Sequence, residues 1–203
     1  MKTLIVGLGF GQLYKKIYES MGAEIITVDA DQSKNPDFVE ITTAIEAHPQ
    51  FDTAHICTPN RTHFALAKKL SGHSKIVFIE KPGVQNVAQW TALTHDKKTK
   101  YVMTKNNQYR DNIGEMANLG HKMSNIELNW KNNNRIPSPG SWFTNKHLAF
   151  GGVSRDLLPH MLSLLIVLSP TDYALYNVID KKVEQRYRLE DCTHTDYGKV
   201  KED

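Results

Sequence analysis

The sequence predicts an α/β protein in which an N-terminal doubly wound parallel sheet is followed by a partial α+β domain with a mostly antiparallel sheet. Three observations support this prediction. Short apolar runs alternate with helical patterns over the first half of the chain, and a glycine-rich turn separates the first run from the first helix. After about residue 108 the alternation stops, so we expect domains at residues 1–108 and 109–203.

The first domain begins with a short apolar run at residues 4–6, typical of a strand buried in a parallel sheet. The helix that follows, at 11–21, carries Leu13, Ile17 and Met21 on one face. The alternation of strands and helices continues through the first domain, which implies parallel strands joined by crossover helices on both faces of the sheet. Further strands are expected at 24–28, 38–41, 54–57, 75–79 and 101–104, and further helices at 62–70, at 86–96 and in a short stretch ending at His48.

The second domain has a different pattern. Residues 126–130 alternate between apolar and polar side chains, as expected of a half-buried antiparallel strand. The stretch 131–145 is rich in Asn and Pro and is expected to be a loop. Helices are predicted at 111–123 and, despite Pro159, at 153–168, and strands at 174–179 and 184–188.

Composition excludes several classes of protein. The net charge is only +3, and the basic residues are not gathered in one block, which argues against nucleic-acid and anionic-membrane partners. Two cysteines, Cys57 and Cys192, have neither metal-ligand spacing nor a disulfide framework, so no metal site is expected. No targeting segment is visible, and the apolar run at 161–168 is too short to span a bilayer. We therefore expect a cytoplasmic protein.

Three glycines stand at alternate positions just after the first predicted strand, in the stretch VGLGFGQLY. A strand, a glycine turn and a helix form the context of a dinucleotide-binding fingerprint, in which the helix N-terminus offers free N–H groups to a pyrophosphate. Gly7 is expected to make the tight turn and Gly9 to admit the pyrophosphate. The third fingerprint position falls on Gln12, which weakens the case for close helix–strand packing unless the preceding glycine compensates. The predicted cofactor-binding residues of this turn are Gly7, Leu8, Gly9, Phe10, Gly11 and Gln12.

An aspartate ends the second predicted strand. Asp29 lies 22 residues after Gly7, close to the spacing of the acid that binds the adenosine ribose. A carboxylate there accepts from both ribose hydroxyls and repels a 2′-phosphate, so the sequence favours NAD over NADP. The alternative is a glycine turn beside an unrelated surface aspartate, which the strand context makes less attractive.

Three further stretches point to one family. They are ICTPNRTH at residues 56–63, IEKP at 79–82 and GGVSRDLLPH at 151–160. In this order and spacing they resemble the Gfo/Idh/MocA oxidoreductases, which include glucose–fructose oxidoreductase and inositol dehydrogenase. The resemblance covers roughly residues 1–165 and implies an N-terminal Rossmann domain followed by a second domain that walls the substrate site.

The first of these stretches follows a predicted strand, at the edge of the sheet where ligands bind. The resemblance implies that Thr58, Pro59 and Asn60 contact the ribose and nicotinamide side of the cofactor. His63 has two open interpretations: it contacts a phosphate of the cofactor, or it is a polar residue at the start of a helix.

The second stretch also follows a predicted strand. The resemblance implies that Glu80 and Lys81 lie against the cofactor and suggests a cis peptide bond before Pro82. A lysine beside a nicotinamide can polarise a substrate oxygen, and burial or a nearby positive charge would lower its pKa enough for proton transfer. The alternative is a surface lysine before a turn.

The third stretch places Asp156 and His160 one turn apart on the same face of a helix. Histidine titrates near neutral pH and can take a proton from a substrate hydroxyl while a hydride leaves the same carbon, and aspartate can orient the substrate or the imidazole. The alternative is an ordinary pair on a helix surface. Arg110 and Trp142 are predicted on the substrate side of the pocket.

Together these residues predict an NAD(P)-dependent oxidoreductase that acts on a secondary alcohol or ketone of a sugar, inositol or related polyol. The alternative is a non-catalytic NAD(H)-binding sensor or scaffold. Members of the family are usually much longer, so a natural short member, a piece of a longer protein and a degenerate relative all remain open. Because open sheet edges favour pairing between chains, we expect a homo-oligomer, a dimer or larger.

Overall fold

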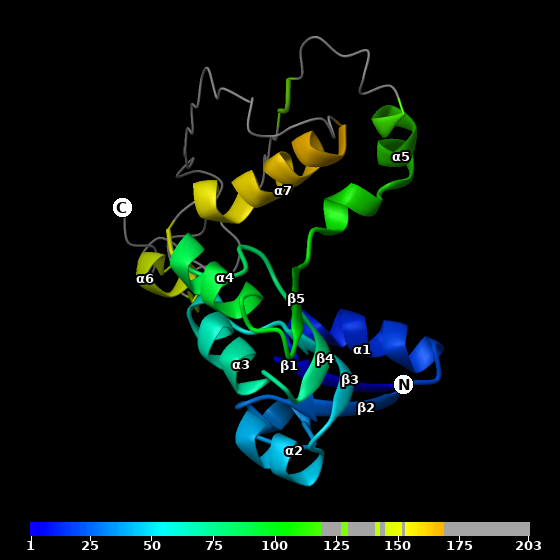
Figure 1. Ribbon diagram of the computed structural model, residues 1–203, viewed down its shortest axis with the longest axis vertical. Coiled ribbons are helices and arrows are strands. Elements are labelled where there is room, and N and C mark those ends of the chain that lie inside the picture. The colour runs from blue at the N-terminus through cyan, green and yellow to red at the C-terminus, as the bar shows by residue number, and fades with distance from the viewer. Residues whose placement is uncertain (119–126, 130–140, 143–144, 152, 169–203) are drawn as a thin grey trace, which may run out of the picture. The chain divides into compact units, whose positions relative to one another are not determined.

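The computed structural model describes residues 1–118, 127–129, 141–142, 145–151 and 153–168. The chain divides into two compact units, Met1–Thr104 and Lys105–Asp203. Figure 1 shows the elements of both units along the chain. The domain boundary predicted after residue 108 stays a prediction, because much of the second unit lies outside the described residues.

One sheet of parallel strands forms the centre of the first unit and consists of β1 (Lys2–Val6), β2 (Glu24–Val28), β3 (Phe51–Ile56), β4 (Ser74–Ile79) and β5 (Lys100–Met103). Their order is β2-β1-β3-β4-β5. Leu4 on β1 lies opposite Ile26 on one side and Ala54 on the other. The chain order changes direction between β1 and β3, which is where a doubly wound sheet opens a ligand crevice at the carboxyl ends of its strands.

The strand predicted at residues 38–41 is wrong. Phe38 makes only a single parallel bridge, to Val28. The Asp37 carboxylate accepts hydrogen bonds from the Thr27 N–H and hydroxyl, at 2.8 and 2.6 Å. Because a side chain takes the main-chain donor that a further strand would need, the ladder ends there. When this bridge is counted as a reduced edge strand, six segments follow the strand order of a dinucleotide-binding sheet.

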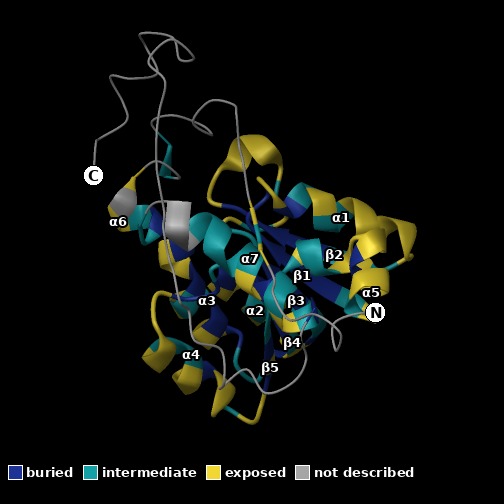
Figure 2. Ribbon diagram, turned by 90° about the horizontal axis from the view of Figure 1, so that it is seen from above, coloured by how far each residue is buried: buried dark blue, intermediate teal, exposed yellow. Residues whose placement is uncertain are grey.

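Helices cover both faces of the sheet (Figure 1). One face carries α2 (Ile41–Ala47), α3 (His63–Lys69) and α4 (Val87–Thr94), and the other carries α1 (Gly11–Ser20). Figure 2 shows the buried strands between these layers. The doubly wound arrangement that the alternating pattern predicted is therefore confirmed.

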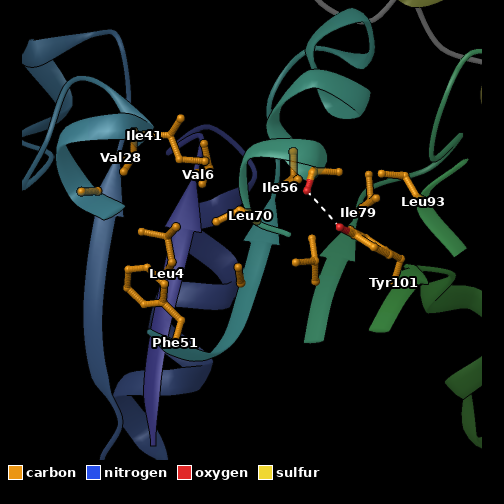
Figure 3. Close-up of a cluster of buried hydrophobic side chains, with 14 of the residues drawn as sticks. Leu4, Val6, Val28, Ile41, Phe51, Ile56, Leu70, Ile79, Leu93 and Tyr101 are labelled. Carbon is orange, nitrogen blue, oxygen red and sulfur yellow. Dashed lines mark hydrogen bonds between the residues drawn. The ribbon is translucent and has the colours of Figure 1, made fainter. Parts of the chain in front are cut away.

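The main core lies between the sheet and α2, α3 and α4 (Figure 3). Leu4, Ile56 and Ile79 are fully buried there, and burial of each such side chain contributes about 1.5–3 kcal/mol. The Tyr101 hydroxyl also enters this core and donates to the Ala67 carbonyl of α3 at 3.2 Å. This contact ties the edge strand β5 to the helix layer.

The packing face of α1 differs from the one that its apolar pattern suggested. Leu13, Ile17 and Met21 are 45–62% exposed, whereas Gly11 and Tyr18 are buried against the sheet. These two buried residues are also at helical spacing. Gly11 lets the main chain of the helix approach β1, and the Tyr18 hydroxyl forms a hydrogen bond with His55 on β3. The helix therefore packs through its small and aromatic side and leaves an aliphatic stripe outside.

The second unit contains helices in its described part. They are η3 (Asn106–Tyr109), α5 (Asp111–Ala117), α6 (Lys146–Ala149) and α7 (Val153–Leu168). The helix predicted at 153–168 is confirmed and runs through Pro159. The amide of Gln108 in η3 donates to the Ser163 carbonyl of α7 at 2.9 Å.

Several predicted elements fall outside the described residues. Of the strand predicted at 126–130, only 127–129 are described, and they form no strand. The strands predicted at 174–179 and 184–188 lie beyond the described part, so the antiparallel character of the second sheet stays a prediction. Within the described residues, every helix is too short or too polar to cross a membrane.

Candidate functional site

The turn after β1 is built on a glycine whose replacement by any other residue would strain the main chain. Gly7 has φ +94°, and a Cβ at this position would lie 2.7 Å from the Cys57 carbonyl oxygen. Its N–H donates to the Val28 carbonyl at 2.8 Å, so the turn is anchored beside the end of β2. The sharp turn predicted at Gly7 follows from both restrictions.

The two other glycines of the turn have different surroundings. A Cβ on Gly9 would meet no atom within 4 Å, so this side of the turn is open to a ligand. A Cβ on Gly11 would lie 2.9 Å from Ile5 Cγ2 on β1. Gly11, the first residue of α1, thus provides the close helix–strand packing that the fingerprint assigns to its third glycine, and Gln12 is not needed for it.

The start of α1 offers main-chain donors to an anion. Phe10 occupies the N-cap position and makes no side-chain capping bond. The first N–H groups of a helix have no intrahelical partner and carry partial positive charge. Leu8 differs, because its N–H already donates to Asp29 Oδ2 at 2.6 Å. The main chain of Leu8 therefore joins the glycine turn to Asp29.

Asp29 lies at the end of β2 and is only 8% exposed. Besides the Leu8 N–H, it accepts the Asp31 N–H on Oδ1 at 2.9 Å and Lys34 Nζ on Oδ2 at 3.0 Å. Burial raises the pKa of this carboxyl, but the hydrogen bonds from Asp31, Leu8 and Lys34 outweigh it, and the pKa is lowered overall. Asp29 is therefore held ionised beside the glycine turn, as a ribose-binding acid requires.

The segment after β3 forms the next part of the same sheet edge. Asn60 is 9% exposed and begins the short helix η2 (Asn60–Thr62). The hydroxyls of Thr58 and Thr62 share a hydrogen bond of 2.6 Å, which closes the loop around Pro59. The three residues predicted to face the ribose and nicotinamide thus lie in one hydrogen-bonded turn.

Of the two interpretations left open for His63, the structure agrees with a polar residue at the start of a helix. Its side chain is fully buried at the start of α3. Nδ1 lies 2.9 Å from the Gly83 carbonyl oxygen, and Nε2 lies 2.8 Å from the Thr58 carbonyl oxygen. Burial lowers the pKa of His63, against the opposing effect of these two carbonyls. Both ring nitrogens face main-chain carbonyl oxygens, and the neutral ring donates its single N–H to one of them, so the His63 side chain lies between the turns after β3 and β4.

The turn after β4 carries the predicted lysine. The Gly83 N–H donates to the Glu80 carbonyl at 2.9 Å, which closes a four-residue turn around Lys81 and Pro82. The Lys81–Pro82 peptide bond is cis, as the resemblance suggested. Glu80 Oε1 accepts the Tyr14 hydroxyl of α1 at 2.6 Å. The lysine-bearing turn is therefore tied to the helix that follows the glycines.

A polar group that sequence reasoning missed lies beneath α1. The Tyr18 hydroxyl is 2.8 Å from Nε2 of buried His55, and the His55 ring stacks on Phe78 with centroids 4.6 Å apart. Burial lowers the pKa of His55 to about 4. Tyr14 packs on the other side of the His55 ring, and burial, followed by its bond to Glu80, raises the pKa of its phenol. The available signal was a histidine between the apolar residues Ala54 and Ile56.

The remaining predicted site residues belong to the second unit. Arg110 is exposed and precedes α5, and Trp142 is half-buried. Asp156 and His160 lie one turn apart in α7, both half-buried. The His160 carbonyl accepts the Ser163 hydroxyl at 2.7 Å. The structure thus places the two predicted acid–base residues on one helix, while their catalytic roles stay predictions.

The predicted cofactor residues gather at one place in the first unit. Each follows the carboxyl end of a parallel strand: the glycines follow β1, Asp29 follows β2, Asn60 follows β3 and Lys81 follows β4. An open Gly9, a helix N-terminus and a buried carboxylate fit the pyrophosphate and ribose of a dinucleotide. Among the described residues, no cluster of three potential metal ligands occurs.

Comparison with known proteins agrees with this arrangement. Residues 1–107 match a family model described as an oxidoreductase family with an NAD-binding Rossmann fold. This match confirms the predicted N-terminal Rossmann domain and the predicted cofactor, NAD. A protein of Amycolatopsis mediterranei (strain S699), named as a candidate oxidoreductase subunit of UDP-kanosamine synthase, is 28% identical over 83% of this chain and 51% of its own length. The chain thus spans about half the length of this curated relative.

Two solved structures have a similar fold. GenD2 from gentamicin A biosynthesis, in complex with NAD, aligns with a TM-score of 0.70 at 18% identity, over 83% of this chain and 53% of its own. The WlbA dehydrogenase of Thermus thermophilus, in complex with NAD and UDP-GlcNAcA, aligns with a TM-score of 0.66 at 16% identity, over 83% and 62%. At these identities the likeness shows the fold alone.

Proposed function

Since the chain belongs to the Gfo/Idh/MocA oxidoreductase family, whose model matches residues 1–107, we propose that it transfers a hydride between NAD and a secondary alcohol or ketone of a polyhydroxylated small molecule. The observation that carries this proposal is the open glycine turn held against a buried, ionised Asp29. A sugar, an inositol or a nucleotide-linked sugar is the proposed substrate class. The relative named after UDP-kanosamine and the fold neighbour that holds UDP-GlcNAcA support the last of these.

The chain's own residues supply four functions in the proposed reaction. The glycine turn and Asp29 bind and orient the dinucleotide, and the turn after β4 presents Lys81 to the substrate oxygen. Bound NAD supplies the hydride acceptor. As the alcohol carbon loses its hydride, His160 accepts the hydroxyl proton and a ketone forms, so that one hydride and one proton leave the substrate. Asp156 orients the substrate hydroxyls or the imidazole of His160.

The test separates cofactor binding from turnover. We expect the tryptophan fluorescence of the protein to be quenched on titration with NADH. We also expect the protein to reduce NAD when a panel of inositols, sugars and UDP-sugars is offered. His160→Ala and Lys81→Ala should each lower turnover by about a hundredfold or more, the usual effect of losing a proton-transfer group, and should retain NADH affinity. Suitable controls are His95→Ala and Lys75→Ala, because both residues are exposed and lie outside the predicted site.

Two results would contradict the assigned roles. If the variants lose NADH affinity while turnover per bound cofactor is unchanged, Lys81 and His160 act in binding. If NADH binds but no member of the panel is oxidised, the alternative function, a non-catalytic NAD(H)-binding sensor or scaffold, is favoured.

A further inference from the structure

A lysine lies against the carboxylate that the proposed function assigns to the adenosine ribose. Lys34 Nζ is 3.0 Å from Asp29 Oδ2 and 3.8 Å from Asp31 Oδ2. Lys34 is the last residue of η1 (Gln32–Lys34), a short turn whose start is capped by the Asp31 carboxylate. The turn ends at Asn35, in the left-handed region with φ 52°, which folds Lys34 back toward Asp29.

The hydrogen bonds already made by Asp29 limit what it can offer a ribose. An ionised carboxylate has about four acceptor positions. Three of them are occupied, by the N–H groups of Leu8 and Asp31 and by Lys34 Nζ. A ribose diol that binds through both hydroxyls needs two positions, so one existing contact must yield. Two of the three contacts come from the main chain, and the third comes from a flexible side chain that is 37% exposed. The Lys34 ammonium is therefore the contact that moves when a ribose arrives.

The charges around Asp29 determine whether the 2′-phosphate of NADP(H) is repelled or attracted. Asp29 and Asp31 carry two negative charges, and both carboxyls have a lowered pKa, so they are ionised at neutral pH. Lys34 adds one positive charge within 4 Å of both. Without it, a phosphate dianion would meet two carboxylates. With it, the dianion meets a displaceable ammonium that can pair with its oxygens.

We propose that Lys34 relaxes the coenzyme specificity of this site, by allowing NADP(H) to bind where Asp29 alone would exclude it. Asp29 sets the preference for NAD(H), and Lys34 limits its extent. The inference rests on the proposed function, since it requires a dinucleotide in this crevice. It concerns the discrimination between two coenzymes, and is measured without a substrate.

The experiment is a pair of fluorescence titrations, with NADH and with NADPH, on wild type and Lys34→Met. We expect the ratio of the NADPH to the NADH dissociation constant to rise by about tenfold or more in Lys34→Met, the size expected for one partly exposed charge near a dianion. Lys34→Arg should keep the wild-type ratio. NADPH affinity should also fall more steeply with added salt in wild type than in Lys34→Met.

The matched control is Lys75→Met. Lys75 pairs with Asp52 at 2.6 Å, at the amino ends of β3 and β4 and thus at the opposite edge of the sheet. Its loss removes an equal charge and should leave the ratio unchanged. An unchanged ratio in Lys34→Met, measured with normal NADH binding, would overturn the role of Lys34 alone. Absence of binding of either coenzyme to wild type would overturn both this inference and the proposed function.

Discussion

His55 illustrates how a single side chain couples this fold to pH. It is 5% exposed, it lies between the rings of Tyr14 and Phe78, and its Nε2 contacts the Tyr18 hydroxyl. Its Nδ1 is buried and has no hydrogen-bond partner within the described part of the chain. Protonation would add a charge at a position that offers it no acceptor, and this explains why burial lowers the pKa of His55 so strongly.

The free energy of unfolding should therefore fall as the pH falls from about 6.5 to about 4. The pKa of His55 is lowered from 6.5 to about 4 on folding, so the unfolded chain takes up a proton first over this window. One proton corresponds to a loss of at most about 1.4 kcal/mol per pH unit. The lowered pKa of His63 acts in the same direction. The measurement is urea unfolding at several pH values.

The contribution of His55 is isolated by comparing two variants. His55→Phe should remove part of the slope, whereas Phe78→Leu loosens the same ring stack without removing a titrating group and should keep the slope while lowering stability at every pH. Equal slopes in wild type and His55→Phe would show that His55 does not titrate in this window.

The turn between β1 and α1 is the element in which sequence and structure agree best. A strand, a glycine run and a helix are local features, so a short stretch of sequence determines them. The packing face of α1 was not predictable in the same way, because Leu13 and Ile17 fit helical spacing as well as Gly11 and Tyr18 do. The choice between these faces depends on partners on the sheet, Ile5 on β1 and His55 on β3, which meet under the helix only when the sheet forms.

Two glycines of this turn should separate folding from binding. Gly7→Ala should lower the free energy of unfolding by about 1–3 kcal/mol, because the left-handed conformation is strained for alanine and its Cβ would overlap the Cys57 carbonyl. Gly9→Ala should leave stability nearly unchanged, since its Cβ enters open space, but raise the dissociation constant for NADH by about tenfold or more. Urea unfolding and NADH titration measure the two effects.

Gly114→Ala is the control for this comparison. It also places a Cβ in open space, but in α5 of the second unit. It should match wild type in NADH affinity. If Gly9→Ala binds NADH as tightly as Gly114→Ala, the pyrophosphate does not approach the turn at Gly9.

For the whole molecule, the sequence predicted more of the first unit than of the second. The sheet, its parallel direction and the residues at its carboxyl edge follow from alternating patterns and short motifs. The reduced edge strand did not follow from them, because the bond from Thr27 to Asp37 joins two residues whose pairing no periodicity indicates. The sequence left two interpretations of His63 open, because the carbonyls that surround it, on Thr58 and Gly83, become neighbours only when two loops fold together.

The predicted self-association is also a property of the whole molecule. Among the described strands, β2 and β5 each have a single strand neighbour, and exposed strand edges favour pairing between chains. We expect light scattering to give at least twice the mass of one chain at micromolar concentration. A mass equal to one chain at every concentration tested would contradict this prediction.

The position of Cys57 beneath the glycine turn has a practical consequence. Its main chain contacts Gly7, and its sulfur would lie 3.8 Å from a Cβ on Gly11. Burial, together with the charge of Glu80, raises the pKa of its thiol, so very little thiolate is present at neutral pH. In a Cys192→Ser background, the rate at which iodoacetamide alkylates Cys57 would report how often this turn opens. A bound dinucleotide that closes the turn would slow that alkylation, which gives the chain a built-in chemical reporter of occupancy.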